Sequence, residues 1–205
     1  GNSQALAGLT ITQSSGVTFA ATLDVSDSNS GTITLTDTVD NANITFNGGT
    51  VTADNFVTAA QGYNLFLLGN ATFANAVTFQ NTGTLDLGNA ASDTLTFNGG
   101  VTESTGGTVT IDGAIVSSDD AISFGAISLG QNLSVTSAGG AISIGTITAA
   151  SGSQDITITS SGGSANTVAV GAIGGSGNIN TVAITSGTLT TLNGNITTDN
   201  SSGNS

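Results

Sequence analysis

The chain has 205 residues and 13 acidic side chains, but no Lys, Arg, His, Pro, Cys, Met or Trp. Its formal net charge of −13 has no cationic side chain to balance it, and this excludes a partner such as nucleic acid, whose phosphates need Lys or Arg. The missing His and Cys also exclude the usual zinc and haem ligands and catalytic triads built on these residues.

Short alternating triplets, in which two apolar residues flank a small polar one, follow one another along the chain. In the first half they occupy residues 9–11, 17–19, 23–25, 33–35, 44–46, 85–87 and 95–97. In the second half they occupy 109–111, 122–124, 127–129, 133–135, 142–144, 156–158 and 168–170. Successive side chains of a strand point to opposite faces, so each triplet predicts a strand with two residues in a core. Gly- and Asn-rich segments such as 47–49 and 98–100 predict the turns between strands.

The least regular segment is 53–69, where a short helix or an irregular loop is the alternative to strands. Tyr63 and Phe66 lie in it and could form an exposed contact patch. Six of the eight Phe residues end or follow alternating strands, and we expect them to stack in the core.

Internal similarity favours a repeat architecture, because residues 45–49 recur as 96–100 and residues 17–19 recur as 77–79. We predict an all-β fold, a single-stranded parallel β-helix (β-solenoid) of roughly eight or nine coils, each of ~20–25 residues. It would fill residues 1–205 as one unit, either complete or a segment of a longer repeat protein. A β-sandwich with strand exchange between subunits is the alternative fold.

A Gly-Thr pair followed by an alternating strand occurs at 31–35, 83–87 and 107–111. In these segments, and in 134–144, the chain resembles the repeat regions of large secreted bacterial β-helix proteins, the filamentous-haemagglutinin type adhesins and autotransporter passengers. The resemblance implies an exported, rod-like, non-catalytic body on the cell surface. It carries over no functional residues.

Carboxylates are the only strong ligands for a metal ion in this sequence. Asp24 and Asp27 lie three residues apart, and Asp37 and Asp40 repeat the spacing. Calcium binds oxygen ligands from such loops, so these four residues are the candidate calcium site, with solvated turn residues as the alternative. We expect no other cofactor.

Two surface motifs come from the abundant Asn and Thr. Glycosylation sequons occur at Asn43, Asn70, Asn132, Asn195 and Asn200, in numbers that chance explains in so Asn- and Thr-rich a chain. Thr-x-Thr strands such as 32–34 and 157–159 look like those of ice-binding solenoids. An ice-binding face needs Thr side chains stacked coil after coil, and their irregular spacing in the sequence argues against it.

The expected role is therefore structural: a component of an extracellular bacterial surface fibre or adhesin shaft, not an enzyme. No charged or helical cap is visible at either end, so we expect self-association into filaments by end-to-end strand stacking, or a place in a long array. The longest apolar run is 65–68, too short for membrane insertion. The alternative is a solenoid binding module for carbohydrate, a host receptor or ice.

Overall fold

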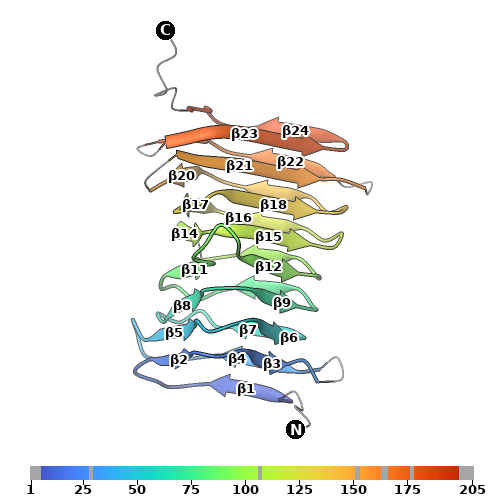
Figure 1. Cartoon of the computed structure of the whole chain (residues 1–205). Helices are drawn as coiled ribbons and strands as arrows, with labels where there is room; N and C mark the ends of the chain where they lie inside the picture. Colours follow the sequence, from blue (N-terminus) through green and yellow to red (C-terminus); the bar gives the residue numbers. More distant parts are fainter. Residues whose placement is uncertain are drawn as a thin grey trace.

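The chain winds into a parallel β-solenoid. The computed structural model describes residues 6–27, 30–105, 108–150, 153–162, 166–175 and 178–198, and every regular element in them is a β-strand. Figure 1 shows the coils stacked one above another, with β1 at one end and β24 at the other. All strand pairs are parallel and join one coil to the next, which confirms the predicted solenoid of about eight coils and not the sandwich.

The described strands form three sheets that run the length of the solenoid. The nine-stranded sheet contains β1 (Gly8–Ile11), β4 (Thr32–Leu35), β7 (Asn55–Thr58), β10 (Val77–Phe79), β13 (Val101–Glu103), β16 (Ile122–Phe124), β19 (Ile142–Ile144), β22 (Thr167–Val170) and β24 (Leu189–Leu192). The seven-stranded sheet contains β2 (Val17–Phe19), β5 (Asn43–Phe46), β8 (Asn64–Leu67), β11 (Leu85–Leu87), β14 (Thr108–Ile111), β17 (Ala126–Leu129) and β20 (Ile147–Ala149). The eight-stranded sheet contains β3 (Leu23–Val25), β6 (Val51–Ala53), β9 (Ala71–Phe73), β12 (Thr94–Phe97), β15 (Gly113–Ser117), β18 (Leu133–Ser137), β21 (Ser153–Ser160) and β23 (Asn178–Ser186).

Strand alternation places one set of side chains inside and the other outside. In β11, Leu85 and Leu87 are buried while Asp86 between them lies on the outer face. Neighbouring coils pair in register, so that Leu85 stacks between Leu65 and Val109. Aliphatic columns therefore run through the interior, and burial of these columns is the main stabilising contribution.

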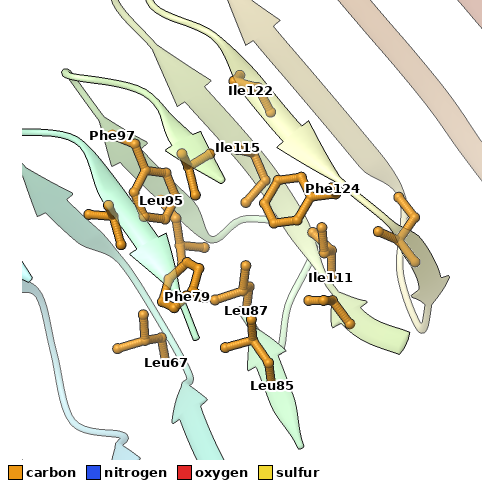
Figure 2. Packing of buried hydrophobic residues seen from close by; sticks show 14 of the residues in the cluster. Leu67, Phe79, Leu85, Leu87, Leu95, Phe97, Ile111, Ile115, Ile122 and Phe124 are labelled. Carbon is orange, nitrogen blue, oxygen red and sulfur yellow. The ribbon is translucent and has the colours of Figure 1, made fainter. Parts of the chain in front are cut away.

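The interior is filled by aliphatic and phenyl side chains from all three sheets, as Figure 2 shows for the middle coils. Phe73 lies at the centre of an aromatic cluster, with its ring centroid 4.8 Å from that of Phe56 and 5.4 Å from that of Phe97. Phe46 and Phe79 extend the cluster to either side of Phe56. The predicted core stack of Phe residues is confirmed.

Segment 53–69 contains strands and no helix, so the helical alternative was wrong: β7 and β8 lie within it. The predicted contact patch was also wrong for Tyr63, which is fully buried at the corner between these strands. Its hydroxyl donates a hydrogen bond to the Leu35 carbonyl (3.0 Å) and accepts one from the Ala59 amide (3.3 Å). Phe66 lies on the outer face of β8 and is half-buried. The corner has interior space for one large ring, and the chain fills it with its only tyrosine.

Serine hydroxyls close the corner where the eight-stranded sheet passes into the nine-stranded one. Four serines stack there in register, and each donates to a main-chain carbonyl: Ser117, Ser137, Ser160 and Ser186. These bonds satisfy carbonyls that the turn removes from the sheet ladder.

Glycine is required where two corners approach closely. Gly88 has a φ of +80°, and a Cβ at this position would lie 1.9 Å from the Asp112 carbonyl oxygen. The next coil therefore packs directly on the Gly88 backbone.

Candidate functional site

No pocket opens in the part of the chain that the structure describes, so the outer faces and the two ends are the surfaces available to a partner. Within the same residues no group of three or more His, Cys, Asp or Glu side chains is placed to hold a metal ion. The features described below are single carboxylates, rows of outward side chains and the end coils.

The four predicted calcium ligands fall at two different corners. Asp24 and Asp27 are exposed at the end of β3, and Asp24 accepts hydrogen bonds from the amide and hydroxyl of Ser26 (3.1 and 2.6 Å). Asp37 and Asp40 follow β4 at the next corner. Hydrogen bonds from Ser26, chiefly from its hydroxyl and secondly from its amide, hold the pKa of Asp24 below its usual value. Both donors lie in the same turn as Asp24. The calcium site remains a prediction.

Asp37 is buried and links two coils. Its Oδ1 accepts the amides of Ser14 (3.2 Å) and Val39 (2.9 Å), and its Oδ2 accepts the Ser14 hydroxyl. Burial pushes the pKa of Asp37 upward, but the bonds from Ser14 and Val39 outweigh burial and lower it. The carboxylate therefore joins the turn after β1 to the coil above, which is a structural role.

Asp86 is a partly buried carboxylate that was not among the predicted site residues. It lies between Phe66 and Thr110 on the outer face of the seven-stranded sheet, and its Oδ1 is buried with no hydrogen-bond partner in the described residues. Burial raises the pKa of Asp86; a bond from Thr110 opposes the rise and the negative charge of Asp112 adds to it. Phe66 becomes the neighbour of Asp86 only through the pairing of β8 with β11, so no local sequence signal marked this carboxylate.

Three of the sequons lie at or just before the start of a strand: Asn43 begins β5, Asn70 precedes β9 and Asn132 precedes β18. Asn43, Asn70, Asn132 and Asn195 are exposed, and Asn200 lies outside the described residues. The Asn43 side-chain oxygen accepts a hydrogen bond from Asn64 on the next coil (2.8 Å). The Oδ1 of Asn70 and of Asn132 accepts the Thr94 and Asp155 amides, respectively (both 2.9 Å). These amides thus brace consecutive coils, while glycosylation remains a prediction.

A row of outward side chains, mainly Thr and interrupted by Val116, runs along the eight-stranded sheet. Its in-register members are Asp24, Thr52, Thr72, Thr96, Val116, Thr136, Thr159 and Thr185. A second row on the nine-stranded sheet contains Thr10, Thr34, Val57, Thr78, Thr102, Ser123, Ser143, Ala169 and Thr191. The expectation that Thr side chains would not stack was therefore wrong. The coils differ in length in their turns, so the strands pair in register although the Thr residues are irregularly spaced in the sequence.

The seven-stranded sheet has a more broken row. Its members are Thr18, Thr45, Phe66, Asp86, Thr110, Ser128 and Thr148. Phe66 and Asp86 interrupt the hydroxyls in the middle coils. The three sides of the solenoid are therefore chemically different, and the eight-stranded sheet carries the longest run of threonine.

Exposed large apolar side chains gather at the two ends. Leu189, Leu192 and Ile196 in the last coil are 58%, 48% and 40% exposed, and Leu6 before β1 is 50% exposed. Leu192 and Ile196 pair with the buried Val170 and Ile173 and face the end of the solenoid, whereas Leu189, like Val57 (46% exposed), lies on the outer face of the nine-stranded sheet. The sequence predicts association at the ends but did not identify these residues, because their exposure depends on the stacking of the coils.

No helix of the described residues is long and apolar enough to cross a membrane. Comparison with protein-family models, with curated proteins and with solved structures finds no match. The geometry of the solenoid itself is therefore the basis for a functional proposal.

Proposed function

We propose that this chain is a shaft segment of an extracellular bacterial surface fibre or adhesin: a rod that separates or joins other parts and carries out no catalysis. The coils would continue along the solenoid axis either within one longer chain or through separate copies. The resemblance of residues 31–35, 83–87 and 107–111 to secreted bacterial β-helix proteins supports the extracellular location.

One observation carries the proposal: the sides of the solenoid are hydrophilic and its ends are not. The outer rows of the three sheets consist mainly of Thr and Ser, with Asp24 and Asp86 among them, whereas the last coil exposes Leu192 and Ile196 at its end and Leu189 beside them. Solenoids normally end in a polar cap, and an uncapped coil leaves strand edges that recruit further strands. A solenoid with polar sides and with ends that can form contacts is suited to extension along its axis.

Immunogold electron microscopy on the producing cells tests this function. We expect an antibody raised against the purified chain to label filaments outside the cell envelope of intact cells. Label found only inside permeabilised cells would contradict the shaft role, whatever the assembly behaviour of the purified chain.

A binding module is the second candidate, and the threonine row of the eight-stranded sheet is the observation that favours it. Stacked strands lie ~4.8 Å apart, so the row offers hydroxyls at a regular repeat. Such a row matches a repeating, uncharged, hydrogen-bonding surface, of which ice is the one that this face fits best.

Thermal hysteresis of the purified chain tests the ice-binding alternative. Ice binding predicts hysteresis that is lost when Thr136 and Thr159 are both replaced by Leu, and retained when Thr45 and Thr110 on the seven-stranded sheet are replaced in the same way. Absence of hysteresis in the unsubstituted chain removes this candidate and leaves the shaft function untouched.

A further inference from the structure

We propose that β24 of one molecule pairs in parallel with β1 of a second copy, so that the nine-stranded sheet continues from molecule to molecule. This inference deepens the proposed function and depends on it only for the idea that the coils extend as a shaft. It commits to separate copies joined head to tail, and to one register of the joining strands.

The two edge strands match in length and in the faces of their side chains. β1 and β24 each have four residues, and each is an outer strand of the nine-stranded sheet with one partner strand among the described residues. Pairing with the buried Val168 and Val170 makes Thr190 and Leu192 the inward positions of β24. The inward positions of β1 are Leu9 and Ile11, which pair with the buried Ile33 and Leu35.

A single register therefore brings all four residues into agreement. Thr190 lies over Leu9 and Leu192 over Ile11 in the core, while Thr191 lies over Thr10 in the outer row. Parallel partners in a sheet point to the same face, so a shift by one residue would turn Leu192 to the outside. At the junction itself, the hydroxyls of Thr191, Thr10 and Thr34 would follow one another in the outer row.

Charge also selects this end. Residues 156–198 contain no charged side chain, although the chain as a whole carries −13. A second copy is itself purely acidic, so it meets least repulsion at the coils that follow Asp155. In the described part of the first coil, Asp24 lies on the outer face of β3 and not on β1.

A two-fold pairing of two C-terminal ends fits less well. It would set β24 antiparallel to another β24, where cross-strand partners must again point to one face. Pairing all four residues would oppose the outward Leu189 to the inward Leu192, so at most three residues of the strand could pair. Head-to-tail contact uses the whole strand and propagates as a filament.

Engineered disulfides test the register, because the chain has no cysteine of its own. The double variant Thr10→Cys/Thr191→Cys places the two cysteines opposite each other on adjacent strands, with Cα atoms ~4.8 Å apart, within the Cα separation that a disulfide spans. After mild oxidation of the full chain, we expect a ladder of dimers, trimers and larger species on a non-reducing gel. Each single variant should remain monomeric, and an equal mixture of the two should give one dimer.

Two further variants show whether cross-linking depends on the proposed interface, and not on general thiol reactivity or on a loss of folding. In the matched control Thr102→Cys/Thr191→Cys, the first cysteine lies in the same outer row but in the middle of the solenoid, and no ladder should form. Adding Leu192→Asp to the double-cysteine variant should reduce cross-linking at least tenfold while the circular dichroism spectrum of the strands is unchanged.

Three outcomes would overturn the inference. Dimers from Thr191→Cys alone would show the two-fold contact, and oligomers that never cross-link in the double variant would show another register. A monomer in which the β24 amides resist hydrogen exchange would show that residues following Thr198 pair with this edge. None of these results bears on where the cell places the chain, so the shaft function is tested separately.

Discussion

At the scale of single residues, buried polar groups join the coils where sheet hydrogen bonds stop. Asp37 is the strongest case, because its carboxylate accepts two amides and a hydroxyl from the turn after β1 and from its own turn. An ion of this kind is stabilised by fixed donors and needs no counter-ion, which suits a chain that has no cation.

Replacing Asp37 with Asn should lower the free energy of unfolding at pH 7 by about 1–3 kcal/mol, since charged acceptors make the stronger bonds. The lowered pKa of Asp37 means that the carboxylate stabilises the fold above its unfolded-state pKa. That contribution disappears as pH falls through the folded-state pKa, so variant and parent should converge in acid. Denaturant unfolding from neutral to acid pH measures the difference in stability between variant and parent, with the exposed Asp40→Asn as the control. A difference that stays constant at every pH would contradict the role of the Asp37 carboxylate.

Tyr63 gives a second test, because it is the only tyrosine in the chain. The pKa of Tyr63 is raised to about 12, mainly by burial, because the opposing hydrogen bonds with Ala59 and Thr58 offset burial only in part. The ionised phenol is therefore favoured in the unfolded chain, and stability should fall as pH rises above the ordinary tyrosine value of about 10.

Ultraviolet titration of the folded protein should show phenol ionisation near pH 12, and near 10 in denaturant. Tyr63→Phe should abolish the signal and remove this part of the alkaline destabilisation. Ionisation at pH 10 in the folded protein would show that the corner between β7 and β8 is open.

At the scale of strands, the aromatic cluster joins the three sheets of the first coils. The ring of Phe56, on the nine-stranded sheet, contacts Phe46 of the seven-stranded sheet and Phe73 of the eight-stranded sheet. Phe66 is the natural comparison, since it belongs to the same region but lies on the outer face of β8.

Phe73→Ala should lower the free energy of unfolding by about 3–5 kcal/mol, the usual cost of removing a buried ring. Phe66→Ala should cost less than about 1 kcal/mol, in line with surface positions. Thermal and denaturant unfolding of the two variants checks the assignment of faces. Equal losses would show that the inward and outward positions of β8 and β9 are wrongly assigned.

Strand position and core residues were predictable from sequence, whereas the pairing of strands was not. The triplets marked both the strands and their inward residues, because alternation is a local property. The repeated segments misled, since 45–49 ends a strand of the seven-stranded sheet and 96–100 ends one of the eight-stranded sheet. They mark strand-and-turn units and not equivalent places in successive coils.

The site residues were predicted less well for a related reason. Burial of Asp37 and Tyr63, and the desolvation of Asp86 by Phe66, depend on the coil above or below. Coil length varies: Val17 pairs with Ile44 but Val109 pairs with Ile127, so the sequence does not state which residues become neighbours. The same variation hid the threonine rows.

At the scale of the whole molecule, the solenoid is a rod with an apolar interior and with polar, acidic sides. Its end coils carry most of the exposed aliphatic residues. Carboxylates repel one another over about 10 Å at 0.1 M salt and further at lower ionic strength. Self-association should therefore weaken at low salt and recover with added salt or divalent cations, although the joining strands β1 and β24 contain no charged residue.

The most direct test of extension along the axis is the diffraction of filaments assembled from the purified chain, by cryo-electron microscopy or aligned fibres. The account predicts strands perpendicular to the filament axis, with a meridional spacing of about 4.7–4.9 Å that continues across the junctions between molecules. Filaments in which the solenoids lie side by side, with that spacing across the axis, would contradict it.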